Sequence, residues 1–273
     1  MADEAILNHT RVAAAGREPA HWLLVLHGIY GAGRNWGTIA RRLVDTRPEW
    51  GAVLVDLRMH GGSRAGFPGP HTMEAAAADV DALVRHLDLH AAAVMGHSFG
   101  GKVALMYAAR HATELRQAWV MDSTPATREP TGSAWRMIEA VRALPDDFAT
   151  RAEAVTGLMA LGYEEGVAQW MAINLEPVEG RYRWRIDFDA MEEMLRDFFR
   201  TDLWPVVEQP PAAVEIHFVK ATQSDTLDDE ATARVEAAAA ANGRVHLHLL
   251  KGGHWINTDN PEGVLELLVE MLP

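Results

Sequence analysis

A serine flanked by two glycines is the strongest chemical signal in the chain. Ser98 lies in the run Gly96–Gly100, which reads Gly-His-Ser-Phe-Gly and follows an apolar stretch. A serine at a sharp turn between a strand and a helix adopts a strained backbone, and a glycine on each side lets the two elements pass closely. The pattern predicts that Ser98 is a nucleophile held at such a turn.

A serine hydroxyl is a weak nucleophile, so it needs a base to take its proton and an acid to orient that base. His254 follows the last apolar run that is typical of a strand, and it is the candidate base. Two aspartates are candidates for the acid: Asp122 ends the predicted strand that follows the helix after the serine, and Asp225 follows the apolar run Val214–Val219. Both candidates preserve the chain order serine, acid, histidine.

Other residue patterns are weaker signals. His86 and His90 stand four residues apart, and His246 and His248 share one face of a predicted strand. Neither pair has a third ligand close to it in the sequence, so we expect no metal site. The glycines of Gly28–Gly33 lack the lysine and the serine or threonine of a nucleotide-binding turn, and we expect no cofactor.

The composition limits the class of protein. The 273 residues, 48% of them hydrophobic, can bury one large core together with an inserted subdomain. Cysteine is absent, which excludes disulfides, thiolate metal sites and cysteine catalysis. A formal charge of −13 disfavours nucleic acid and anionic membranes, so the expected partner is a small molecule. The acidic start Met1–Glu4 and the lack of a long apolar run predict a cytoplasmic protein.

Strands and helices alternate along most of the sequence. Helices of about a dozen residues separate short apolar strands, which indicates a mostly parallel sheet covered on both faces. Ligands gather at the carboxyl ends of such strands, where His27, Asp56, Ser98 and Asp122 all fall. The predicted strands are Trp22–His27, Gly51–Asp56, Ala91–Met95, Gln117–Met121, Val214–Val219 and Arg244–Leu250.

The alternation stops between residues 124 and 211. This segment has a mostly helical rhythm with frequent prolines, and we interpret it as a helical cap inserted between two parts of the core, residues 1–123 and 212–273. Some of its large apolar side chains are expected to line a substrate pocket. They are Trp135, Trp170, Trp184, Trp204, Met137, Met159, Met171, Met191 and Met194.

Four motifs together resemble the α/β-hydrolase superfamily over almost the whole chain. They are His27–Gly31, Asp56–Ser63, Gly96–Lys102 and Gly253–Trp255. Within the superfamily the chain looks most like small bacterial carboxylesterases and thioesterases related to the abhydrolase-domain proteins. The doubled glycine and lysine after the serine, the Arg-Met-His-Gly run and the tryptophan-rich cap carry this finer resemblance.

The resemblance implies an α/β-hydrolase fold, with Ser98 as nucleophile and His254 as general base. It implies an oxyanion hole formed by the backbone N–H groups of Ile29 and Phe99, with His27 bracing the loop. The esterase group can place its acid at the position of Asp122, which we therefore favour over Asp225, because the loop around Asp225 departs from the commoner pattern. The charged residues Asp56, Arg58 and His60 are interpreted as holding neighbouring loops together.

The expected activity is that of a serine carboxylesterase that cleaves short- to medium-chain acyl esters through an acyl-serine intermediate. A thioesterase, a lactonase or a hydrolase of carbon–carbon bonds would use the same three residues. A protein of this fold that senses a ligand without catalysis is the alternative from a different class. Fold resemblance alone does not choose among them.

Overall fold

A computed structural model describes residues 5–111 and 114–273. The chain first builds the sheet and the helices around it, up to the strand that follows the serine. These elements are β1 (His9–Val12), β2 (His21–Leu26), the 3₁₀ turn η1 (Gly33–Trp36), α1 (Gly37–Thr46), β3 (Trp50–Val55), α2 (Met73–Leu87), β4 (Ala91–His97), α3 (Phe99–Arg110) and β5 (Gln117–Met121).

The inserted segment follows β5, and the sheet resumes after it. The insertion contains α4 (Ser133–Arg142), β6 (Asp147–Phe148), α5 (Arg151–Ala160), α6 (Glu165–Ala172), β7 (Leu175–Val178), β8 (Arg181–Trp184), α7 (Phe188–Arg200) and α8 (Trp204–Glu208). The chain ends with β9 (Glu215–Ala221), α9 (Asp229–Ala241), β10 (Val245–Leu250), α10 (Ile256–Asp259) and α11 (Pro261–Met271).

The central sheet has seven strands in the order β1-β3-β2-β4-β5-β9-β10. All neighbouring strands are parallel except β1, which pairs antiparallel with β3. The strands β3, β4 and β5 are buried at every position, as expected for strands covered on both faces. The predicted mostly parallel sheet is confirmed, whereas the short and partly polar β1 was not predicted.

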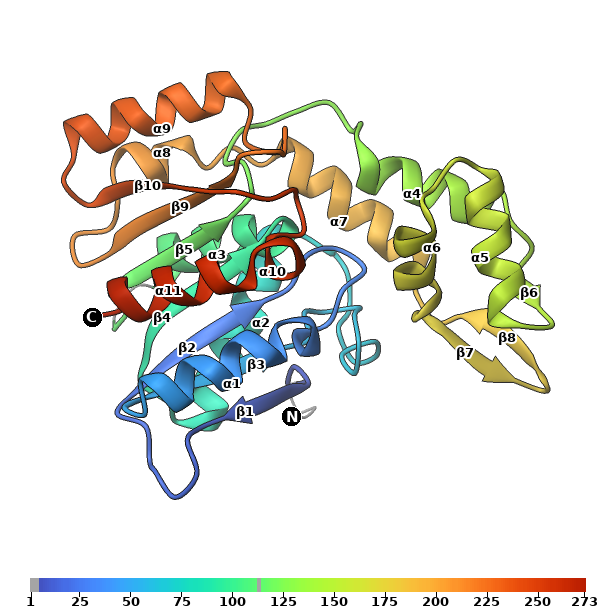
Figure 1. Ribbon diagram of the computed structural model, residues 1–273, viewed down its shortest axis with the longest axis horizontal. Coiled ribbons are helices and arrows are strands. Elements are labelled where there is room, and N and C mark those ends of the chain that lie inside the picture. Colours follow the sequence, from blue (N-terminus) through green and yellow to red (C-terminus); the bar gives the residue numbers. More distant parts are fainter. Residues whose placement is uncertain (1–4, 112–113) are drawn as a thin grey trace.

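Helices cover both faces of the sheet (Figure 1). One apolar cluster joins the sheet to α2, α3 and α9, for example through Val80, Val103 and Val235. A second cluster on the opposite face joins it to α1 and α11, for example through Leu43 and Leu268. The carboxyl ends of the strands thereby lie in one layer, which positions the loops that follow them.

The inserted segment projects from one end of the sheet (Figure 1). It is not wholly helical, because β6, β8 and β7 form a small antiparallel sheet in that order. Its last helix, α8, returns to the α/β body, where Trp204 stacks 4.2 Å beneath the Arg234 guanidinium of α9. Among the described residues, no helix is long and apolar enough to cross a membrane.

Candidate active site

Ser98 occupies the sharp turn between β4 and α3. Its φ of 52° and ψ of −117° are strained for a residue with a side chain, at a cost on the order of 1–3 kcal/mol. A Cβ atom on Gly96 would overlap the Gly100 carbonyl, and one on Gly100 would lie 2.5 Å from the His27 carbonyl oxygen. The predicted strand-to-helix turn is confirmed, and close packing explains why both positions are glycine.

His254 lies in the loop between β10 and α10 and reaches back over the sheet to the serine. Its Nε2 atom is 3.0 Å from Ser98 Oγ, and its Nδ1 atom is 2.6 Å from Asp122 Oδ2. A carboxylate only accepts hydrogen bonds, so Nδ1 carries the proton and Nε2 presents its lone pair to the serine hydroxyl. The structure thus joins Ser98, His254 and Asp122 in one hydrogen-bonded chain.

The loop after β9 holds the Asp122 carboxylate in place. Asp122 is fully buried at the end of β5. Its Oδ1 atom accepts a hydrogen bond from the Ala221 N–H at 3.1 Å, and its Oδ2 atom accepts one from Ser224 Oγ at 2.6 Å. Thr226 Oγ1 lies 3.0 Å from His254 Nδ1. The hydroxyls of Ser224 and Thr226 were not singled out in the sequence, although they flank the alternative acid Asp225.

Asp225 does not join this arrangement. Asp225 is exposed, and no described residue forms a hydrogen bond or an ion pair with its side chain. The loop after β9 therefore turns its two hydroxyls, rather than its carboxylate, toward His254. Of the two candidate acids, Asp122 is the one that contacts the histidine.

The two expected oxyanion donors border the serine. Phe99 is the first residue of α3, where a backbone N–H has no acceptor within the helix. Ile29 lies in the loop after β2 and lines the same cavity as Ser98, and none of the described residues accepts a hydrogen bond from its N–H. Neither N–H has an acceptor among the described residues, and their role as oxyanion donors stays a prediction.

Two buried histidines brace the loop that carries Ile29. His27 Nδ1–H donates to the Gly28 carbonyl at 2.7 Å, while its Nε2 accepts from the Leu57 N–H at 3.0 Å. His60 Nε2 accepts from the Tyr30 N–H at 3.1 Å. Burial lowers the pKa of His27, and it lowers the pKa of His60 to about 3, so both rings stay neutral acceptors.

The charged residues after β3 serve the same loops, as predicted. Asp56 accepts hydrogen bonds from the N–H groups of Gly33 and Gly62, each at 2.8 Å. Arg58 forms a largely buried ion pair with Asp79, with Nε 2.6 Å from the carboxylate. These contacts fix the loops after β2 and β3 without bringing either charge to the serine.

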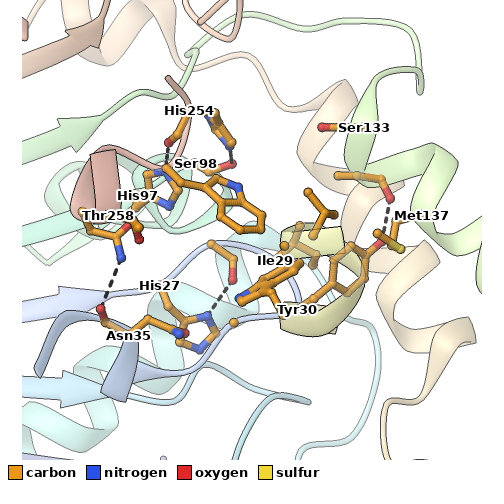
Figure 2. Close-up of a pocket in the computed structure, with 18 of the residues that line it drawn as sticks. His27, Ile29, Tyr30, Asn35, His97, Ser98, Ser133, Met137, His254 and Thr258 are labelled. Atoms are coloured by element: carbon orange, nitrogen blue, oxygen red, sulfur yellow. Dashed lines mark hydrogen bonds between the residues drawn. The ribbon is translucent and has the colours of Figure 1, made fainter. Parts of the chain in front are cut away.

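Ser98 and His254 open into a cavity of about 530 Å³. Figure 2 shows Ser98, His254 and His97 on one side of it, and Ile29 and Tyr30 on another. The inserted segment contributes Met137, Tyr163, Val167 and Trp170 to its wall, and the loop after β10 contributes Trp255, whose ring lies 4.9 Å from that of Trp170. Most of the exposed area of the wall is apolar, and Ser98 and His254 are among the polar side chains that line it.

Only part of the expected set of apolar residues reaches this cavity. Met137 and Trp170 line it. Trp184 instead packs edge-on against Phe148 and Phe188, and Trp204 lies on the α/β body. The other methionines lie in the core, except Met159, which is exposed. Most of these large side chains therefore pack in the hydrophobic core that the insertion shares with the α/β body, and not at the cavity.

Lys102, in the fourth position of α3, belongs to the motif after the serine, and the sequence alone did not predict its contacts. Its side chain is fully buried, and Nζ donates hydrogen bonds to the carbonyls of Ala126, Phe198 and Thr201 at 2.7–2.9 Å. These carbonyls lie at the two ends of the inserted segment. Lys102 thus ties both ends of the insertion to the helix that begins at the serine.

Comparisons with known proteins agree with this fold. The sequence profile of the alpha/beta hydrolase family matches residues 23–267. The mouse protein named sn-1-specific diacylglycerol lipase ABHD11 is 25% identical over 259 residues, which are 92% of this chain and 80% of that protein. Esterase YbfF of Escherichia coli is 25% identical over 254 residues, 90% of this chain and 91% of its own length.

Solved structures show the same architecture. A marine microorganism esterase superposes with a TM-score of 0.82 at 26% identity, covering 98% of this chain and 99% of its own. The structure of E-2-(acetamidomethylene)succinate hydrolase superposes with a TM-score of 0.76 at 22% identity, over 96% of this chain and 93% of that one. The chain belongs to the alpha/beta hydrolase family, and its esterase and lipase relatives support hydrolase activity.

Proposed function

We propose that this hydrolase is a serine carboxylesterase that cleaves short- to medium-chain acyl esters. One observation carries the proposal: the hydrogen-bonded chain from Asp122 through His254 to Ser98 ends at the wall of an apolar cavity. A serine whose hydroxyl faces an imidazole lone pair is prepared to attack a carbonyl carbon. Esterases named among the relatives support the same reaction class.

The proposed reaction begins when Ser98 Oγ attacks the ester carbonyl and His254 Nε2 takes the hydroxyl proton. The oxygen of the tetrahedral intermediate then accepts hydrogen bonds from the N–H groups of Ile29 and Phe99, which need no rearrangement as charge develops. The histidine returns its proton to the leaving alkoxide, leaving an acyl-serine. Water, deprotonated by the same histidine, releases the carboxylic acid and restores the serine.

The cavity supports the proposed range of substrates. A volume of about 530 Å³ accommodates a ligand of modest size, and its apolar wall suits an alkyl chain. Glu164 at the cavity and the net charge of −13 oppose a negatively charged substrate. Short and medium neutral esters therefore fit better than long-chain or multiply anionic ones.

The test is turnover of p-nitrophenyl esters by the full chain and two matched variants. Ser98→Ala is expected to lower kcat on the order of a millionfold, because nucleophile and base act as a unit. Ser133→Ala is the control, since Ser133 lines the same cavity at the start of α4 and has no part in the proposed chemistry. Full activity in Ser98→Ala would refute the proposal.

A substrate panel tests the finer assignment. Acetate and butyrate esters are expected to turn over faster than palmitate esters, and esters faster than thioesters or lactones of matched size. Preference for a thioester or a lactone would keep Ser98 as the nucleophile but replace the substrate class. Absence of turnover on every acyl compound, together with tight binding of one of them, would instead indicate a ligand-sensing protein.

A further inference from the structure

A cluster of histidines lies on β9 and β10, far from the serine. The parallel register places His246 directly beside His217, and Glu215 precedes His217 on the same face of β9. One potential ligand atom from each of these three side chains lies within 4.8 Å of the other two. Two strands that are distant in sequence thus supply the third ligand that neither histidine pair has in the sequence.

Unsatisfied nitrogen atoms point to a missing partner at this cluster. The Nε2 atoms of His217 and His246 are both buried. That of His246 has no hydrogen-bond partner among the described residues, and that of His217 has only a long contact with the Glu215 carboxylate. His217 is fully buried, and the Glu215 carboxylate lies 3.5 Å from its Nε2 atom. A buried polar atom without a partner is costly, and a bound cation would satisfy both nitrogens at once.

The neighbours of His217 hold it in the form that binds metals. Its Nδ1 atom lies 3.1 Å from His248 Nε2, and its ring stacks on Trp119 with centroids 4.2 Å apart. When Nδ1–H donates to His248, Nε2 is left with a lone pair directed away from that bond. Histidines that ligate metals almost always donate their other N–H to a neighbouring acceptor, and here His248 takes that place.

The carboxylate is also positioned. Gln117 Nε2, on the neighbouring strand β5, donates to Glu215 Oε2 at 3.2 Å. The Glu215 side chain is about half exposed, so an ion can enter from solvent and the carboxylate can shift to meet it. A four-coordinate ion with bonds of about 2.1 Å draws its ligands closer than they now lie, and this half-exposed side chain can make most of that adjustment.

We propose that Glu215, His217 and His246 form a binding site for Zn²⁺ or a similar divalent transition metal. Two imidazoles and one carboxylate are a ligand set that zinc takes in proteins, with water in the fourth position. The site joins β9 to the edge strand β10, so a bound ion stabilises this edge of the sheet. The site is separate from the proposed triad. Ala221, whose N–H donates to Asp122, lies four residues after His217 on β9, which corresponds to about 13 Å along the strand.

The experiment measures Zn²⁺ affinity of the full chain after removal of metal, by competition with a chromogenic chelator. One equivalent is expected to bind, and Glu215→Gln and His246→Gln are each expected to weaken binding by at least about 100-fold. His90→Gln is the matched control, because His90 also pairs with a carboxylate, Glu114, at 3.0 Å, but outside the cluster. It should leave the affinity unchanged.

Two further readouts distinguish this site from the proposed triad. Co²⁺ in place of Zn²⁺ should give the visible absorption of a four-coordinate ion in the wild type, and lose it in His246→Gln. The activity of the chain on p-nitrophenyl butyrate should be unchanged by removal of metal and by either cluster substitution, which also shows that the variants are folded. Absence of saturable binding by the wild type, or equal affinity in the wild type and both cluster variants, would overturn the proposal.

Discussion

Replacing Asp122 with asparagine tests the proposed triad most directly, because the structure dictates how the amide must lie. The Ala221 N–H donates to Oδ1 of Asp122 at 3.1 Å. A backbone N–H in a strand cannot turn round to accept, so the amide oxygen of the variant must occupy this position. Its NH₂ group then replaces Oδ2, the atom that lies 2.6 Å from His254 Nδ1.

An N–H group facing Nδ1 forces the imidazole into the other tautomer. Nδ1 must then accept, and the ring proton moves to Nε2, which faces Ser98 Oγ at 3.0 Å. In that state His254 has no lone pair for the serine proton. We expect Asp122→Asn to lower kcat by about ten-thousandfold, as in other serine triads, which corresponds to about 5.5 kcal/mol in the activation barrier.

The assay is hydrolysis of p-nitrophenyl butyrate by Asp122→Asn and Asp225→Asn, with unfolding measured for both so that stability is matched. Asp225 is exposed and does not contact the histidine, so its charge acts only through a screened field. Its variant should stay within about twofold of the wild type. A large loss in Asp225→Asn beside near-normal turnover in Asp122→Asn would refute the reasoning, and equal modest losses would indicate that other groups can orient His254.

Three further predictions concern the framework. Ser98→Gly should unfold with a free energy about 1 kcal/mol higher than Ser98→Ala, because glycine tolerates the φ of 52°, and equal denaturation midpoints would contradict this. Gly100→Ala should lose about 3 kcal/mol of stability, because its Cβ would lie 2.5 Å from the His27 carbonyl oxygen. An unchanged melting temperature would show that the backbone at His27 can move to make room for the methyl group. Burial lowers the pKa of His60 in the folded chain to about 3. Below about pH 6.5 the unfolded chain therefore binds a proton at His60 that the folded chain does not bind, so the free energy of unfolding falls on acidification. From about pH 6.5 to 5, denaturant titrations should show the wild type losing roughly 2 kcal/mol more than His60→Gln, and parallel losses would argue that His60 is not buried neutral.

Local patterns in the sequence were enough to predict the turn at Ser98 and the sheet around it. The glycines at 96 and 100 are required by the close passage of backbone, a constraint that acts within a few residues and is therefore visible in a short motif. The buried parallel strands are recognisable for the same reason, since each is a compact apolar run. The short strand β1 lacks that signature, because it lies at the sheet edge and two of its four residues are exposed.

The position of His254 in the loop after the last strand also follows from chain order, but its acid does not. Strands β5 and β9 are neighbours in the sheet, so the loops after both reach the same histidine. Asp122 and Asp225 are equally compatible with that topology. The direction of each side chain separates them, and it depends on the φ of 44° at Asp122 and on the hydroxyls of the loop after β9.

The histidine cluster depends on tertiary structure to a still greater degree. His217 and His246 are separated by a whole helix in the sequence, and each strand shows only scattered polar positions. Strand order places β10 beside β9, and the register sets His246 against His217. The sequence by itself determines which residues can do chemistry and which short turns they occupy. The pairing of distant strands decides which of those residues meet, because no local interaction encodes the register between segments that come together only when the sheet forms.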